Sequence, residues 1–145
     1  MIQTNFRSIA DQLCEIYYSE EVWMKQRMHP DVAVEYHLSQ LERGAIKVVT
    51  EMDVVLGYIQ VFKITQEQVN RLLQHLPFNE STENITSGDI AFIHNLYIDK
   101  NFRGRTRETF KKLREMFFEY VKGCTSVVGV EQKYRERIKL FNLKG

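Results

Sequence analysis

The N-terminal part of the chain carries two hydrophobic patterns that predict amphipathic helices. In the first, apolar residues recur every three or four positions, which is the spacing of one helical face. The second helix is expected to begin at Pro30, where a missing N–H is tolerated, and to end at Gly44. Residues 21–29 fit neither pattern. The apolar faces should consist of Phe6, Ile9, Ala10, Leu13, Ile16 and Tyr17 in the first helix, and Val34, Leu38 and Leu41 in the second.

After Gly44 the pattern becomes alternating, which predicts a β-hairpin. Residues 45–51 and 54–64 are the expected strands, and Met52 and Asp53 form the expected tight turn. The second strand carries apolar residues on both of its faces. It is therefore expected to be covered on both sides.

A short helix and a polar loop should follow the hairpin. Thr65 and Gln68 have the spacing of a capping box, which marks the start of a helix. The segment from Pro77 to Gly88 is rich in Asn, Ser, Thr and Glu, which favours a loop. The apolar side of the helix should consist of Val69, Leu72, Leu73 and Leu76.

The remaining residues predict a strand, a long helix and two more strands. Residues 89–99 form the first strand, and a basic loop, 100–105, leads into the helix, which Gly123 should end. Further strands are expected at 125–132 and 138–143, and the strands that flank the long helix should lie parallel. The apolar stripe of the helix should consist of Phe110, Leu113, Phe117, Tyr120 and Val121.

This order of elements predicts an α+β fold, with a mixed, mostly antiparallel central sheet and helices on both faces. There is no repeat and no linker, so residues 1–145 are expected to form one domain. No leader pattern opens the chain, and no apolar run approaches the roughly 20 residues of a membrane helix. We therefore expect a cytoplasmic protein without a membrane partner.

Charge and cysteine content narrow the picture further. The net charge is +1, which gives no global field toward nucleic acid. Lys133, Arg135 and Arg137 belong to a basic stretch near the C-terminus, but alternation of charged and apolar residues favours a solvated edge strand over a nucleic-acid site. Cys14 and Cys124 are interpreted as free buried thiols, with one long-range disulfide as the alternative.

A motif at the end of the strand 89–99 resembles a known family. The residues from Leu96 to Gly104 read LYIDKNFRG. They are similar to the run of GCN5-related N-acetyltransferases (GNAT family) that leads from the central strand into the pyrophosphate loop. The order of elements is also similar, and the resemblance covers roughly residues 45–132. It implies an acyl-CoA N-acyltransferase fold, acetyl-CoA as acyl donor, and an amine of a small molecule or protein as acceptor.

The resemblance also implies where acyl-CoA would bind. A helix N-terminus offers unpaired N–H groups and partial positive charge to a phosphate. Arg103 and Gly104 match the family's Arg/Gln-x-x-Gly-x-Gly/Ala loop, whereas Thr106 and Glu108 replace its later small residues. Glu108 thereby places a carboxylate where an anion should bind. The implied acyl-CoA-binding residues are Leu96, Tyr97, Ile98, Arg103, Gly104, Arg105, Thr106 and Arg107.

Three residues are candidates for the acid–base chemistry of acyl transfer. The family often supplies the acid as a tyrosine after the strand that follows the acyl-CoA helix, which implies Tyr134 here. Glu131, at the end of that strand, and His94, on the central strand, are the candidate bases, and histidine titrates near neutral pH. Glu51 is a weaker third choice.

Two further expectations concern the strand 89–99. Alternation places Asn95 and Tyr97 on the strand face opposite His94, where they would contact pantetheine or the acceptor. Backbone N–H groups near Tyr97 and Ile98 are expected to aid attack on the thioester.

The sequence leaves two functions open. One is an acyl-CoA-dependent N-acyltransferase; the other is a non-catalytic GNAT-like module retained for protein interaction, similar to those encoded in phages and mobile elements. Residues 65–88 interrupt the usual family order, and this insertion either selects the acceptor, docks a partner or stabilises the surface. A homodimer through the last strand, 138–143, is a further expectation.

Overall fold

The computed structural model describes residues 2–19, 29–74, 76–99, 106–130 and 138–142. The helices are α1 (Ile2–Ser19), α2 (Pro30–Glu42), α3 (Gln66–Leu73) and α4 (Thr106–Tyr120). The strands are β1 (Ile46–Glu51), β2 (Val54–Ile64), β3 (Ile90–Ile98), β4 (Ser126–Val130) and β5 (Ile138–Asn142). Each predicted helix and strand is present, although α3 ends before Leu76.

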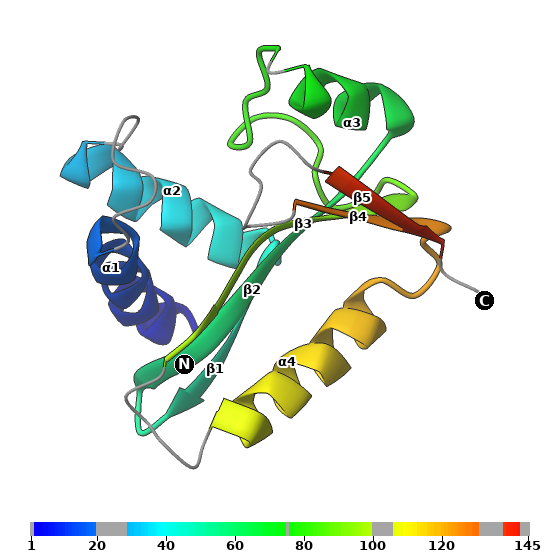
Figure 1. Ribbon diagram of the computed structural model, residues 1–145. Helices are drawn as coiled ribbons and strands as arrows, with labels where there is room; N and C mark the ends of the chain where they lie inside the picture. The colour runs from blue at the N-terminus through cyan, green and yellow to red at the C-terminus, as the bar shows by residue number, and fades with distance from the viewer. Residues whose placement is uncertain (1, 20–28, 75, 100–105, 131–137, 143–145) are drawn as a thin grey trace.

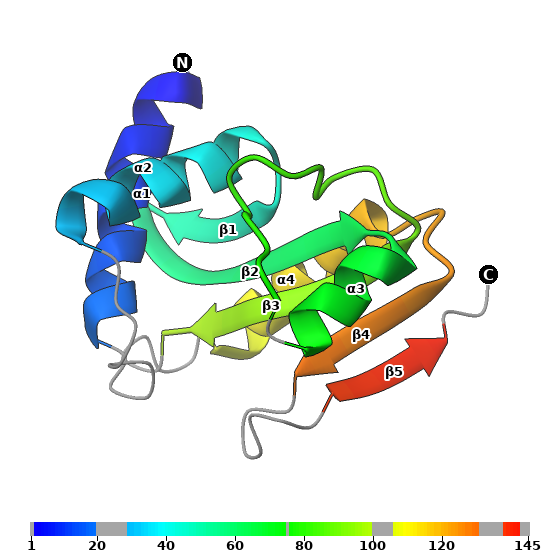
Figure 2. The ribbon, with the colours of Figure 1, turned by 90° about the horizontal axis from the view of Figure 1, so that it is seen from above.

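The strands form one mixed sheet in the order β1-β2-β3-β4-β5 (Figure 2). Neighbouring strands are antiparallel except β3 and β4, which are parallel and connected through α4. A parallel pair needs such a crossover because its two strands run in the same direction. The predicted fold class is therefore confirmed, as is the parallel pairing of the strands that flank the long helix.

Helices cover both faces of the sheet (Figure 1). Helix α4 packs on one face, where burial of apolar surface stabilises the fold by about 25 cal/mol per Å². Helices α1, α2 and α3 pack on the other face. The core under α4 includes Leu56, Ile59, Val61, Ala91, Leu113 and Val127. On the opposite face, the core contains Ala10, Leu13, Leu41 and Tyr58 at α1 and α2, and Phe62, Ile64, Val69 and Phe92 at α3.

The β1–β2 turn and the α3 start have the predicted geometry. Met52 and Asp53 adopt positive φ angles of 51° and 65°, the combination that matches the twist of a two-residue hairpin. The Thr65 side chain accepts a hydrogen bond from the Gln68 backbone, and the Gln68 side chain accepts one from the Thr65 backbone. Both features follow from short-range sequence.

The segment after α3 crosses the end of β2 at Gly88. Thr86 lies beside Lys63 on one edge of β2, whereas Ile90 pairs with Ile64 on the other edge. A Cβ on Gly88 would lie 2.2 Å from the carbonyl carbon of Ile64. Glycine is therefore required where the two backbones meet.

Some predicted apolar faces are wrong in detail. Leu73 and Leu76 are 38% and 46% exposed, because α3 ends at Leu73 and only its first turns reach the sheet. Phe110 of α4 is 48% exposed, and Thr109 is buried in its place. Helix α2 buries the polar residues His37 and Gln40 beside its apolar residues.

The two cysteines are free. Cys14 is buried, whereas Cys124 is half-buried, so the expectation of buried thiols holds fully only for Cys14. Burial, with a smaller effect from Asp11, raises the pKa of the Cys14 thiol to about 11, which keeps it protonated at neutral pH. Among the described helices, none has the length and apolar character needed to cross a membrane.

Candidate functional site

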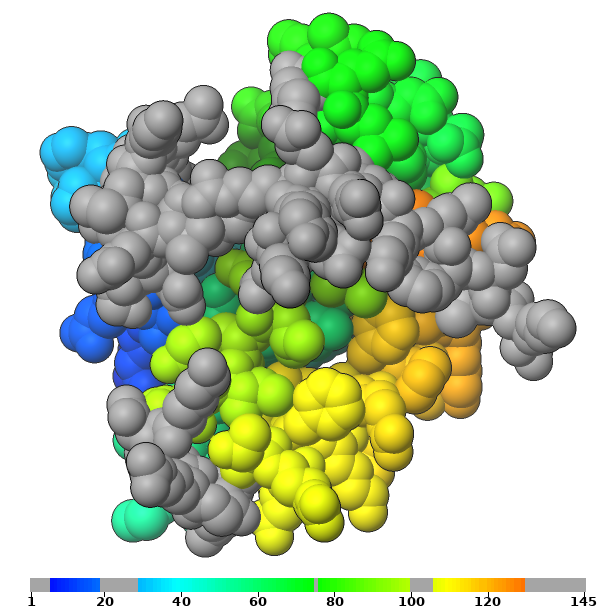
Figure 3. Space-filling model, viewed as in Figure 1, coloured from blue at the N-terminus to red at the C-terminus, as the bar shows by residue number. Residues whose placement is uncertain are grey.

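Strand β3 has two dissimilar halves. Residues Ile90 to Ile93 pair with β2 on one edge and with β4 on the other. Beyond Ile93 the β3–β4 pairing stops, while the pairing with β2 continues to Ile98. The first half of β3 is buried, and the second half is partly exposed. In the space-filling view, the yellow-green surface of this region lies between the surfaces of α1 and α4 (Figure 3). Within the described residues, the β3–β4 pairing thus ends next to His94, and the described part of β4 ends at Val130.

A β-bulge lies where this pairing ends. Gln60 of β2 lies opposite Asn95, but the next residue, Val61, lies opposite Ile93. His94 is therefore the extra residue of the bulge, and such bulges re-aim side chains. Sequence alone gave no sign of this irregularity.

The bulge overturns the expectation that His94 and Asn95 point to opposite faces. The His94 ring stacks on Phe62, with 5.0 Å between ring centroids. Asn95 Nδ2 donates to the hydroxyl of Tyr58 at 2.7 Å, and the Tyr97 ring stacks on Tyr58 at 5.7 Å. Tyr58 and Phe62 are four residues apart on one strand, so they share a face. His94, Asn95 and Tyr97 consequently share that face as well.

His94, the extra residue of the bulge, belongs to a cluster of polar side chains. We define this polar cluster as Tyr36, Gln40, Gln60, Glu80 and His94. His94 Nε2 lies 3.7 Å from Glu80 Oε1. The Tyr36 hydroxyl donates a hydrogen bond to Glu80 Oε2. These groups come from α2, β2, β3 and the loop after α3, so only the folded chain brings them together.

Two buried glutamines fix the geometry of this cluster. Gln60 Nε2 donates to the Tyr36 hydroxyl at 2.8 Å and to Gln40 Oε1 at 3.1 Å. Gln40 Nε2 in turn donates to the backbone carbonyl of Glu80 at 3.1 Å. Gln40 is 0% exposed, and a buried amide is costly unless its groups are paired. The hydrogen bonds therefore compensate the burial and hold both Tyr36 and Glu80 in place.

The environment of the cluster sets its charge. Burial and the neighbouring Glu80 carboxylate raise the pKa of Tyr36 well above its usual value, so Tyr36 remains a phenol and a hydrogen-bond donor. The side chains of His94 and Glu80 are 37% and 23% exposed, so a solute can reach both. An imidazole beside a carboxylate is equipped to take up a proton, because the carboxylate stabilises the imidazolium that results.

Of the other predicted acid–base residues, Glu51 alone falls within the described residues. Glu51 pairs with Val54 at the β1–β2 turn, whereas His94 lies at the level of Gln60, so Glu51 is not part of this cluster. Tyr134 and Glu131 fall outside the described residues. No group of three His, Cys, Asp or Glu side chains that could hold a metal ion occurs within the described ranges.

The expected acyl-CoA-binding residues are described only in part, because Arg103, Gly104 and Arg105 also fall outside the described residues. Thr106 and Arg107 are exposed in the first turn of α4. Glu108 lines a small cavity of about 70 Å³ with Thr50 of β1, among others. In the sheet, β2 and β3 lie between β1 and β4. Glu108 lies on the β1 side, away from the edge of β3 that pairs with β4.

Helix α4 approaches the sheet closely near its N-terminus. A Cβ on Gly57 of β2 would lie 2.7 Å from the Tyr97 carbonyl oxygen and 2.8 Å from Thr109 Cγ2. Glycine at this position therefore lets α4 start directly over the end of β3.

The backbone direction of β3 changes one expectation. The N–H of Asp99 donates to the Leu56 carbonyl at 2.8 Å. Because hydrogen bonding alternates along an antiparallel ladder, the N–H of Tyr97 also points toward β2. The N–H groups of Leu96 and Ile98 point to the opposite edge, and that of Leu96 donates to Asn95 Oδ1. Of the N–H groups near Tyr97 and Ile98, that of Tyr97 is thus directed to β2, whereas that of Ile98 has the direction needed to reach a thioester.

Sequence reasoning missed Tyr36 and Glu80. Tyr36 lies on a helix whose apolar periodicity does not include it, and Glu80 lies in a polar loop of ordinary composition. Neither carries a local signal, because their pairing spans 44 positions of sequence.

The arrangement of the described residues is a GNAT-like fold. The GNAT-like decarboxylase GphF, in complex with isobutyryl-CoA, superimposes with a TM-score of 0.56 at 16% sequence identity, over 86% of this chain and 62% of the decarboxylase. The chain therefore spans less than two thirds of that protein. An N-acetyltransferase from Staphylococcus aureus Mu50 superimposes with a TM-score of 0.49 at 15% identity, over 90% and 79% of the two chains. No protein-family model and no curated protein matches this sequence.

Proposed function

We propose that this protein is an acyl-CoA-dependent N-acyltransferase that transfers an acetyl group to an amine. The observation that carries the proposal is the position of His94, at a bulge where β3 leaves β4 and beside the Glu80 carboxylate. The complex of the decarboxylase GphF with isobutyryl-CoA supports acyl-CoA as the class of donor, and acetyl is our narrower choice. We place the reaction in the cytoplasm, and the free thiols are consistent with that compartment.

Our proposed site for the arm of an acyl-CoA is the outer edge of β3. After Ile93 this edge presents backbone groups that do not pair with the described part of β4. At the end of the paired part, no described atom lies within 4 Å of the position that a Cβ on Gly129 would occupy. The N-terminus of α4, with Thr106 and Arg107, is our proposed site for the pyrophosphate. When bound, acyl-CoA supplies a thioester carbonyl open to nucleophilic attack.

The residues of the chain then have distinct roles. His94 takes the proton from the acceptor amine, and Glu80 stabilises the imidazolium. The amine nitrogen forms a bond to the acyl carbon while the carbon–sulfur bond breaks. Tyr134 is our proposed donor of a proton to the leaving thiolate, as the family resemblance implies. The backbone N–H of Ile98, on the outer edge of β3, is the proposed donor to the carbonyl oxygen.

One observation favours the second function, a non-catalytic interaction module. Thr106 and Glu108 stand where the family resemblance implies small residues, which is the change expected of a module that has no need to bind pyrophosphate. The GNAT-like fold also supports other chemistry, as the decarboxylase illustrates.

Calorimetric titration of acetyl-CoA into the protein separates the two functions. We expect micromolar binding and, for Glu108→Gly, an affinity at most about threefold higher, because this carboxylate faces β1. Glu115→Gly is the matched control, since it adds the same helix-interior glycine two turns away. His94→Gln should retain binding and slow thiol release in the presence of primary amines by about 10²-fold or more. Absence of binding to both the natural chain and Glu108→Gly would favour the interaction module.

A further inference from the structure

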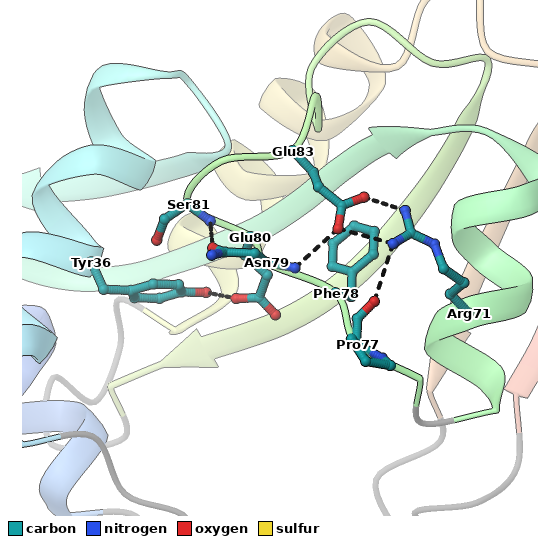
Figure 4. Close-up of a pocket in the computed structure, with 8 residues that line it drawn as sticks. All are labelled: Tyr36, Arg71, Pro77, Phe78, Asn79, Glu80, Ser81 and Glu83. Carbon is teal, nitrogen blue, oxygen red and sulfur yellow. Dashed lines mark hydrogen bonds and ion pairs between the residues drawn. The ribbon is translucent and has the colours of Figure 1, made fainter.

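We infer that residues 65–88, together with α2, form a binding pocket for an organic ammonium ion, with Glu80 as its counter-ion. The inference rests on the proposed function, in which this ion is the acceptor amine. The pocket, called here the α2–α3 pocket, has a volume of about 520 Å³ (Figure 4). It is lined by Tyr36, Arg71, Pro77, Phe78, Asn79, Glu80, Ser81 and Glu83.

The pocket adjoins the proposed base. In the lining, the Tyr36 hydroxyl points at the Glu80 carboxylate and donates a hydrogen bond to it (Figure 4). Glu80 is shared, because its other carboxylate oxygen lies 3.7 Å from His94 Nε2. An ammonium group held at Glu80 would therefore lie next to the ring that we propose takes its proton.

Arg71, the one cation among the described lining residues, is paired with carboxylates. Arg71 Nη1 donates to Glu83 Oε2 at 3.1 Å and Nη2 donates to Glu83 Oε1, so the pair is bidentate. Arg71 Nε also lies 3.1 Å from Glu67 Oε1. The guanidinium of Arg43, outside the lining, donates to backbone carbonyls and not to the Glu80 carboxylate. Among the described lining residues, Glu80 is therefore the carboxylate without a paired guanidinium, which favours a cationic ligand over an anionic one.

The loop that carries Glu80 is also held through its backbone. The backbone carbonyl of Glu80 accepts hydrogen bonds from Gln40 and from Arg43 Nη1, the latter at 2.6 Å. Arg43 Nη2 also donates to the carbonyl of Glu83. These bonds tie the loop to α2 in addition to the hydrogen bond from Tyr36 to the Glu80 carboxylate, so a substitution that removes the charge of Glu80 leaves the backbone attachment in place.

The remaining lining suits the organic part of such a ligand. Tyr36 and Phe78 belong to the lining, and the guanidinium of Arg71 lies over the Phe78 ring, 5.2 Å from its centroid, so Tyr36 is the aromatic group proposed to meet the ammonium. Tyr36 stays neutral at all moderate pH values because its pKa is raised by burial and by Glu80. Aromatic rings attract cations and cover apolar groups at the same time. The ligand class is thus a compact primary amine with an apolar body.

Titration of 2-phenylethylamine into the full chain, without acyl-CoA, tests the inference. We expect saturable binding at pH 7, with changes in the His94 ring signals in NMR spectra. The neutral 2-phenylethanol and the anionic 3-phenylpropanoate should bind at least tenfold more weakly. Glu80→Gln, which keeps the side-chain shape, should weaken amine binding about tenfold, the loss of a charge-assisted contact. Glu67→Gln, on the outer side of Arg71, is the matched control and should leave binding unchanged.

Each result distinguishes this inference from the proposed function. Equal binding of the amine and the alcohol, or unchanged binding by a Glu80→Gln protein with unaltered thermal unfolding, overturns the ammonium pocket. If Glu80→Gln fails to fold, the ligand comparison on the natural chain decides the question alone. Binding of acetyl-CoA without binding of any amine would sink the pocket but not the acyl-CoA site. Amine binding without acetyl-CoA binding would support the pocket and overturn the transferase.

Discussion

The two ends of the sheet are built in different ways. At the end covered by α3 and the following loop, polar side chains are buried and hydrogen-bonded to one another, with Gln40, Gln60 and Tyr36 at the centre. At the opposite end, where α4 begins, Thr109 packs directly against Gly57 and the flanking charged residues are exposed. The packing at the α3 end therefore depends on the identity of particular side chains. The packing at the α4 end depends on how closely the helix approaches the backbone of the sheet.

This difference explains how the two halves of the proposed reaction can tolerate different amounts of sequence change. A helix N-terminus and a strand edge bind through backbone groups, which survive substitutions such as Thr106 and Glu108. A pocket for a specific amine depends on side chains, so it needs a fixed network such as the one around Glu80. The loss of a sequence motif at α4 is therefore weaker evidence against acyl-CoA binding than it first suggests.

Substitution of glycine gives the largest expected difference between the two ends. Gly88→Ala should destabilise the fold by about 3 kcal/mol or more, because its Cβ would meet the Ile64 backbone at 2.2 Å. Gly57→Ala should cost about 1–3 kcal/mol, because its Cβ would lie 2.7 Å from the Tyr97 carbonyl oxygen, a wider approach than that at Gly88. Gly129→Ala, with no described atom within 4 Å, is the control and should change stability little. Urea denaturation measures all three, and equal stabilities of Gly88→Ala and Gly129→Ala would refute the close crossing of the two chain segments.

Removal of the buried amides should have an intermediate effect, confined to the α3 end. Gln60→Leu keeps the volume but deprives the Tyr36 hydroxyl and Gln40 Oε1 of their donor, at a cost of about 1–3 kcal/mol. Gln40→Leu should cost a similar amount, and the double variant should cost less than the sum. Thermal unfolding measures stability, and the amine titration should weaken in parallel while acetyl-CoA binding does not. Strictly additive effects would show that the two glutamines act independently.

The smallest expected effect is a pH dependence that arises from α2. Burial lowers the pKa of His37 from its usual 6.5, and Nδ1 lies 2.7 Å from the Ala33 carbonyl oxygen. As the pH falls, His37 therefore takes up a proton at a higher pH in the unfolded chain than in the folded chain. The contribution of neutral His37 to the free energy of unfolding is fully present above pH 6.5 and declines as the pH falls toward the folded-state pKa. The slope is at most about 1.4 kcal/mol per pH unit. Urea midpoints of the natural chain and His37→Gln at pH 7 and 5 measure it, and identical slopes would exclude His37 as the source.

Much of the architecture is local in origin and was predictable for that reason. The capping box at Thr65, the turn at Met52 and Asp53, and the helix end at Gly123 each depend on residues within a few positions of one another. The fold class followed from the order of these elements, since a strand, a helix and another strand favour a parallel pair. Exposure of Leu76 and Phe110 was not predictable, because periodicity identifies a face but not how far it remains in contact with the sheet.

The site depends on contacts that no local pattern records. His94 has no pairing partner on β2, and this bulge places it on the same face as Asn95 and Tyr97. The bulge depends on how β3 pairs with β2, which no local pattern in β3 records. Glu80 reaches His94 and Tyr36 because the loop after α3 is hydrogen-bonded to α2 through Gln40 and Arg43. The chain order specifies helices and strands through short-range periodicity and capping. The catalytic and binding arrangement proposed here exists only in the tertiary structure, because pairing between distant segments sets its register, charge and burial.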